Sequence, residues 1–127
     1  MASYFENGFL VTKSPGKITL TLTCGYGQPV TTSVFLIKQD GGSEKIKAFD
    51  GNTNNLEIGD SSVLKSQRLK IHSTIHDIQD NAPGQETEDI NLYEKISCNE
   101  EFADVKFVEK TTGKGEFINC FYEVTII

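Results

Sequence analysis

The chain contains no tryptophan, only one arginine, Arg68, and no long apolar run. Because no apolar run approaches the roughly 20 residues that a membrane-spanning helix needs, we expect no membrane span. Twelve basic residues stand against 18 acidic ones, so the formal net charge is −6 and no basic field is available to hold phosphate groups. We therefore expect no nucleic-acid partner, whereas proteins, metal ions and neutral ligands stay open.

Cysteine is also scarce. Cys24, Cys98 and Cys120 are odd in number, widely spaced, and each lies within a strand pattern. This usage indicates buried free thiols in a reducing compartment, although one disulfide plus one free thiol is also compatible with it. The first residues, 1–7, lack the charged and apolar regions of a secretory signal. We expect a cytoplasmic protein.

Hydrophobic residues are arranged with a period of two, which is typical of half-buried strands. Apolar and polar residues alternate most clearly over 17–24, 69–76, 90–97 and 117–127. About nine such patterns at the 8–12-residue spacing of all-β domains, with no long helix, predict one domain, 1–127, folded as an antiparallel β-sandwich. A small β-barrel is the alternative, but barrels of this length usually carry a Trp near the first strand or a helical lid, and this chain has neither.

Turn residues predict how the strands connect. Asp40-Gly41-Gly42-Ser43 predicts a tight hairpin, because these residues tolerate the positive φ of such turns. Residues 59–65 predict either one helical turn or a loop. We further expect the strands starting at Leu69 and Ile90 to form a hairpin, and Val105–Val108 to pair with Phe117–Ile127 as the last hairpin.

The loop between the strands starting at Leu69 and Ile90 is acidic and contains no basic residue. Its oxygen ligands are of the kind that calcium takes from irregular loops. They do not match the spacing of an EF-hand, and a plain solvated loop is the alternative. The candidate metal ligands are Asp77, Asp80, Asn81, Glu86, Glu88 and Asp89.

No catalytic constellation is visible, and we assign no catalytic residue. His72 and His76 are the only histidines. In a strand, four residues span roughly 13 Å, too far for both rings to bind one zinc ion, so we expect both on the solvent face of a sheet. No nucleophile elbow or electropositive cysteine is present. The sequence favours a protein that is not an enzyme.

The strand patterns at 30–39 and 117–127 carry apolar residues on both faces. This indicates a sheet face that meets a partner or lies under a loop. If the two strands are neighbours, their outer faces form one patch. The candidate interface residues are Phe35, Ile37, Phe117, Phe121 and Ile127.

These patterns favour a protein–protein interaction or assembly component, either an inhibitor- or immunity-type binder or a self-associating homo-oligomer. The partner would be another protein or the chain itself, with a neutral ligand possible. The alternative function is a calcium-dependent carbohydrate- or lipid-binding module that uses the 77–89 loop. Calcium is the only cofactor that the sequence suggests.

Overall fold

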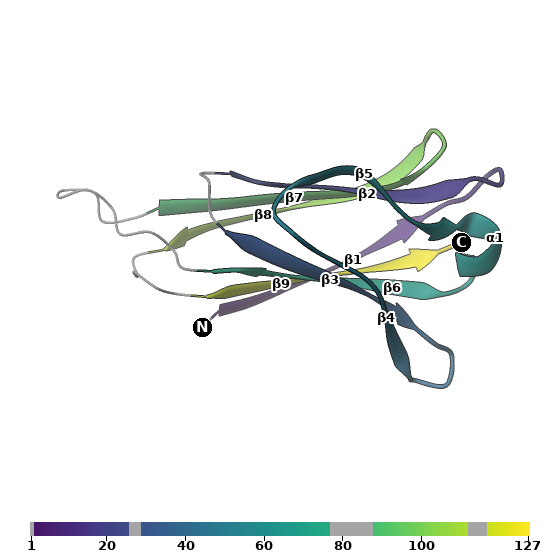
Figure 1. Ribbon diagram of the computed structural model, residues 1–127, viewed down its shortest axis with the longest axis horizontal. Coiled ribbons are helices and arrows are strands. Elements are labelled where there is room, and N and C mark those ends of the chain that lie inside the picture. The colour runs from purple at the N-terminus through teal and green to yellow at the C-terminus, as the bar shows by residue number, and fades with distance from the viewer. Residues whose placement is uncertain (1, 26–28, 77–87, 112–116) are drawn as a thin grey trace.

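The computed structural model describes residues 2–25, 29–76, 88–111 and 117–127. Over these ranges the chain forms two stacked β-sheets, with one short helix at one end of the stack (Figure 1). The elements are β1 (Ala2–Leu10), β2 (Lys17–Cys24), β3 (Val30–Ile37), β4 (Ser43–Asp50), β5 (Thr53–Asp60), α1 (Ser61–Leu64), β6 (Arg68–Ile75), β7 (Glu88–Cys98), β8 (Glu101–Thr111) and β9 (Ile118–Ile126).

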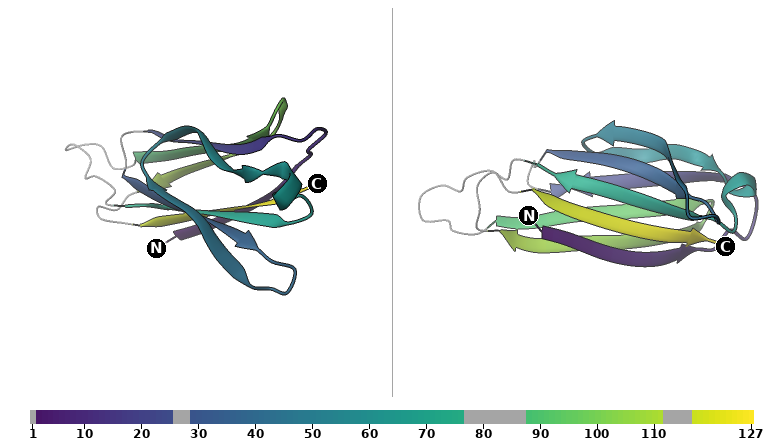
Figure 2. Two further views of the ribbon diagram at one scale, coloured as in Figure 1. Left: turned by 45° about the vertical axis from the view of Figure 1, so that its right-hand side comes forward. Right: turned by 90° about the horizontal axis from the view of Figure 1, so that it is seen from below.

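The strand order is β1-β9-β6-β3-β4 in the five-stranded sheet and β5-β2-β7-β8 in the four-stranded sheet. The predicted all-β sandwich is therefore confirmed, with two separate sheets rather than the single closed sheet of a barrel. Neighbouring strands are antiparallel except at one edge, where β1 runs parallel to β9 with Ala2 opposite Ile118 and Leu10 opposite Ile126. The right-hand view of Figure 2 shows β1, β9 and β6 side by side in this order.

The period-two patterns place the core between the sheets. Along β9 every second residue from Ile118 to Ile126 is buried, and β2 and β6 show the same alternation, as predicted. The fully buried aliphatic side chains come from both sheets, so each sheet covers the apolar face of the other. The largest of them are Leu10, Ile18, Leu20, Leu22, Leu69, Ile71, Ile75, Leu92 and Ile96.

Both of the longer predicted hairpins are wrong. β6 lies in the five-stranded sheet and β7 in the four-stranded one, so the acidic segment between them does not close a hairpin. Likewise β8 pairs with β7, while β9 pairs with β6 and β1. An inward apolar face is buried equally well in either sheet of a sandwich, so alternation along the chain does not specify the pairing partner.

The tight turns follow their local sequence. The predicted 40–43 hairpin joins β3 to β4, with Gly41 at φ 91° and the Asp40 carboxylate accepting a hydrogen bond from the Gly42 N–H at 2.8 Å. β7 and β8 are joined through Asn99, at φ 56°, whose side-chain amide donates to the Ser14 carbonyl at 3.2 Å. The 59–65 segment contains the helical turn α1 rather than only a loop.

The three cysteines are free and buried, which confirms the prediction of buried free thiols. Within the described ranges, no helix combines the length and apolar character that crossing a lipid bilayer requires.

Candidate functional site: the outer face of the five-stranded sheet

Three rings on neighbouring strands stack across the outer face of the five-stranded sheet. Strand register places Phe5 on β1 opposite Phe121 on β9, and Phe121 opposite His72 on β6. The Phe5 and Phe121 ring centroids are 4.7 Å apart with planes 6° from parallel, and those of Phe121 and His72 are 4.3 Å apart at 15°. We call these three residues the aromatic ladder.

The ladder ends at an exposed side chain. Phe5 is 71% exposed. Phe9, four residues further along β1 on the same face, is 65% exposed. Adjacent strands lie about 4.8 Å apart, which matches the ring separations, so the rings stack along the strand-to-strand direction. The facing sides of neighbouring rings are therefore covered by one another. At the edge of the sheet, the Phe5 ring stacks on Phe121 with one face, and its other face has no ring partner among the described residues.

Stacking within the ladder limits the ring faces that a sugar could cover. A pyranose ring packs on the flat face of an aromatic side chain, and the inner faces of the ladder are covered by its own members. The outer face of Phe5 stays open and can also contact protein side chains, since aromatic residues are enriched at protein interfaces.

Polar contacts hold the histidines on this face. The His72 Nε2 atom lies 3.0 Å from the Asn119 Oδ1 atom and 3.3 Å from the Thr74 Oγ1 atom. His76 Nε2 lies 2.7 Å from Thr31 Oγ1, and its ring meets Phe117 edge-on with centroids 5.6 Å apart. Both histidines are thus on the outer face, as expected from the alternation. Among the described residues, no group of three or more His, Cys, Asp or Glu side chains is arranged to hold a metal ion.

The predicted interface residues share this face but do not form one apolar patch. β6 lies between β3 and β9, so the two apolar strands are not neighbours. Phe35 and Ile37 on β3 are half-buried, and the Nζ atoms of Lys45 and Lys70 lie 5.8 and 5.5 Å from the Phe35 ring centroid.

Toward β9, the face becomes more apolar. Phe121 is half-buried within the ladder, and Phe117 and Ile127 are 42% and 48% exposed. An ion pair of Arg68 with Glu123, 2.6 Å long, separates the ladder from the end of the strand. On this face, the exposed apolar surface is therefore concentrated on β1 and at the two ends of β9, and it does not extend to β3.

Phe5 and Phe9 are not among the interface residues that the sequence pattern predicted. Their alternation around Asn7 is visible in the sequence, but the stack on Phe121 joins residues more than a hundred positions apart. The parallel pairing of β1 with β9 places Phe5 beside Phe121.

The candidate calcium ligands are not brought together by any described geometry. Asp77, Asp80, Asn81 and Glu86 lie outside the described residues. Glu88 and Asp89 belong to the first part of β7, and their side chains also lie outside the described part of the structure. The calcium site stays a prediction.

A second unusual feature is a carboxyl group in the core. Glu94 on β7 is 0% exposed, and within the described ranges neither carboxylate oxygen has a hydrogen-bond partner. It lies opposite Leu22 on β2 and Val105 on β8. Burial disfavours the charged form and raises the pKa of Glu94 from 4.5 to about 8. At neutral pH this side chain is therefore mostly the neutral acid.

Polar side chains from the opposite sheet share the core with Glu94. Register places Ser73 between Cys120 and Thr32, and the Thr32 and Ser73 hydroxyl oxygens are 2.9 Å apart. Burial, followed by the negative charges of Glu94 and Cys24, raises the pKa of Cys120 to about 12. The Cys120 thiol therefore keeps its proton at neutral pH, which makes it a poor nucleophile.

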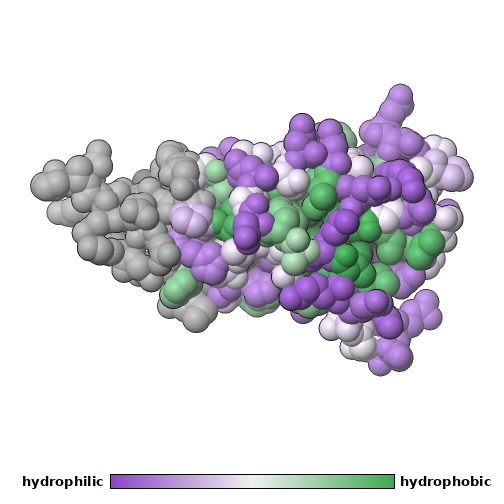
Figure 3. Space-filling view, viewed as in Figure 1, coloured by the Kyte–Doolittle hydropathy of each residue, from purple (hydrophilic) through white to green (hydrophobic). Residues whose placement is uncertain are grey.

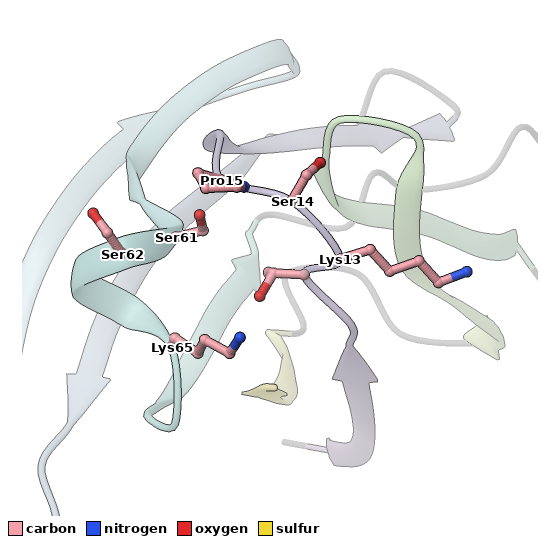
Figure 4. A pocket seen from close by; sticks show the side chains of 7 residues that line it. Lys13, Ser14, Pro15, Ser61, Ser62 and Lys65 are labelled. Carbon is pink, nitrogen blue, oxygen red and sulfur yellow. The ribbon is translucent and has the colours of Figure 1, made fainter.

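A small pocket near α1 is lined by polar side chains, several of which already bond within the chain (Figure 4). It has a volume of about 130 Å³ and is lined by Thr12, Lys13, Ser14, Pro15, Ser61, Ser62 and Lys65. The Thr12 hydroxyl already donates to the Ile127 carbonyl, and the Ser61 hydroxyl accepts from the Gly16 N–H. Lys13 extends away from the serines in Figure 4 and pairs with Glu101 at 3.5 Å.

On the side of the sandwich crossed by β5, Figure 3 shows hydrophobic side chains gathered in the right-hand half, bordered and interrupted by hydrophilic ones. Ile46, Phe49 and Ile58 are only partly buried and pack against the core from β4 and β5.

Comparison of the chain with protein-family models, curated proteins and solved structures found no match.

Proposed function

We propose that this chain is a non-enzymatic protein–protein interaction or assembly component that binds through the outer face of β1 and β9. The observation that carries this proposal is the aromatic ladder with its exposed end, Phe5, beside the equally exposed Phe9. Fully burying one such side chain is worth about 1.5–3 kcal/mol, so covering both would supply a large part of a micromolar affinity, which corresponds to about 8 kcal/mol.

The charge of the chain supports selection among partners. A net charge of −6 steers basic proteins toward the surface and repels acidic ones, while the aromatic face supplies affinity. An inhibitor- or immunity-type protein that covers a basic partner is one form of this function. A self-associating subunit is another, and in that case the aromatic face has to outweigh the repulsion between two copies of charge −6. The three buried free thiols favour action in the reducing cytoplasm.

The test compares aromatic residues on opposite sheets. Phe5→Glu and Phe121→Glu place a charge in the ladder, and Phe102→Glu is the matched control. Phe102 is 57% exposed on the four-stranded sheet, where the Lys95 Nζ atom lies 5.5 Å from its ring centroid. Far-UV circular dichroism should first establish that all three variants fold.

Two assays then read binding. One is sedimentation velocity of the purified chain over a concentration series, and the other is retention of a protein from an extract of the source cells on the immobilised chain. We expect the ladder variants to lose at least about tenfold in affinity, the effect of removing an interface hot spot, while Phe102→Glu retains it. Equal behaviour of the ladder variants and Phe102→Glu in both assays would refute the proposed function.

A further inference from the structure

The free edge of β1 differs from the other sheet edges. β1 pairs with β9 on one side, and no strand in the described ranges pairs with its other side. Such an edge presents unpaired backbone N–H and C=O groups to any strand that can align with it. Phe5, Asn7 and Phe9 on this strand are all exposed.

The remaining edge strands carry the charges that prevent such pairing, and β1 nearly lacks them. Over its nine residues β1 has one charged side chain, Glu6. β5 is protected by two carboxylates, Glu57 and Asp60, and by an irregular register with β2. Charged residues are denser on the other two edges: Glu44, Lys45, Lys47 and Asp50 on β4, and Glu101, Asp104 and Lys106 on β8.

The sequence of β1 is complementary to itself. Its outward residues around Asn7 read Phe5, Asn7, Phe9, a pattern that is symmetric about Asn7. If two copies pair antiparallel with Asn7 opposite Asn7, then Phe5 lies opposite Phe9 of the other copy and Glu6 lies opposite Gly8. Aromatic residues then meet aromatic residues, and the two Glu6 carboxylates do not face each other.

The same register extends the aromatic ladder. The unstacked face of Phe5 points toward the sheet edge, where Phe9 of the second copy would be the next ring. Strand spacing across the new pair would equal the spacing that already gives the 4.7 Å stack of Phe5 on Phe121.

We propose that β1 is a homodimerisation edge: two copies of this chain pair their β1 strands antiparallel about a two-fold axis at Asn7. The two five-stranded sheets would join into one continuous sheet of ten strands, carrying a ladder of rings across the interface. This rests on the proposed function and names its partner as a second copy. An interface of one strand pair and its aromatic neighbours is at the small end of specific interfaces, so we expect a reversible dimer with a dissociation constant in the micromolar range.

A single-cysteine cross-link tests the register. Asn7→Cys places one thiol opposite its own copy at the two-fold axis, where antiparallel pairs have Cα atoms about 4.5–5.5 Å apart, within disulfide reach. Ser3→Cys, exposed on the same face of β1, has no opposing thiol in this register. The native cysteines are buried, so we expect the introduced thiol to be the reactive one in each variant.

Under mild oxidation we expect Asn7→Cys to form a disulfide-linked dimer at least about tenfold faster than Ser3→Cys. Equal rates, or no dimer from Asn7→Cys at concentrations where the chain associates, would overturn the proposed register.

Salt dependence separates a second copy from a basic partner. Because each copy carries a net charge of −6, screening should strengthen the homodimer as ionic strength rises, whereas binding to a basic protein should weaken. We expect sedimentation velocity to show a dimer that tightens with salt and that Phe5→Glu and Phe9→Glu abolish, but Phe102→Glu does not.

The two proposals can fail separately. A chain that stays monomeric up to about 1 mM, above any micromolar dissociation constant, overturns the homodimer. If Phe5→Glu still loses a partner protein that Phe102→Glu keeps, the proposed function survives that failure.

Discussion

Replacing Glu94 with glutamine should remove a large part of the pH dependence of stability between about pH 4.5 and 8. Glu94 is fully buried without a hydrogen-bond partner among the described residues, and burial raises its pKa from 4.5 to about 8. In this pH range the unfolded chain releases the Glu94 proton and the native protein keeps it. The unfolded state therefore binds fewer protons, and the free energy of unfolding falls as pH rises.

The size of the effect follows from the two pKa values. Each pH unit between them costs about 1.4 kcal/mol, and the difference between pH 5 and pH 7.5 amounts to roughly 3 kcal/mol. Below pH 4.5 both states are protonated and the penalty vanishes. A glutamine side chain cannot ionise, and its amide has nearly the shape of the neutral acid, so Glu94→Gln should resemble the native protein at pH 5 and exceed its stability at pH 7.5.

The measurement is urea unfolding of both proteins at several pH values between 5 and 8, followed by far-UV circular dichroism. The informative quantity is the difference in unfolding free energy between variant and native protein at each pH, because other titrating groups are common to both. Glu100→Gln, an exposed glutamate in the turn between β7 and β8, is the matched control and should leave the curve parallel to that of the native protein.

A stability difference between Glu94→Gln and the native protein that does not change with pH would refute this reasoning. It would mean that the carboxyl group is hydrated or paired in solution and titrates as it does in the unfolded chain.

Three further predictions concern other parts of the molecule. Gly8→Ala should lower the free energy of unfolding by about 1–3 kcal/mol, since the added Cβ would lie 2.5 Å from the buried Tyr122 hydroxyl oxygen; an unchanged urea midpoint would contradict this. The thiols of Cys24, Cys98 and Cys120 should react with Ellman's reagent only when urea unfolds the protein, because all three are buried. Burial also raises the pKa of Cys24 to about 11 and of Cys120 to about 12, which lowers the fraction of reactive thiolate. Rapid labelling of the native protein would count against the buried positions. If the 77–89 loop binds calcium, millimolar calcium should raise the melting temperature by several degrees relative to EDTA, since a ligand at 100 times its dissociation constant adds about 2.7 kcal/mol to the free energy of unfolding. Asp77→Asn and Asp80→Asn should abolish this rise. An unchanged melting temperature of the native protein would contradict calcium binding by this loop.

The sequence by itself determined which residues face the core. In β6 and β9 alternate residues are buried as their period-two patterns predict, because successive side chains of any strand point to opposite sides. The 40–43 hairpin was also predictable, since Asp-Gly and Gly-Gly favour positive φ locally. These features depend only on residues a few positions apart, and together they were sufficient for the fold class.

Only the tertiary structure decided which strands pair. β6 and β7 follow each other in the chain yet lie in different sheets, and β1 pairs in parallel with β9 from the other end of the chain. Alternation cannot select among these arrangements, because each of them buries the same apolar faces.

The candidate site depends on which strands pair. The sequence placed Phe121 on an outer face, but the ring of Phe5 reaches it only through the β1–β9 register. Glu94 occupies an inward position of its strand pattern, between Leu92 and Ile96, and its complete burial follows from the opposite sheet closing over it. In both cases a local pattern fixes the direction of a side chain, and the side chains that it meets come from strands distant in sequence.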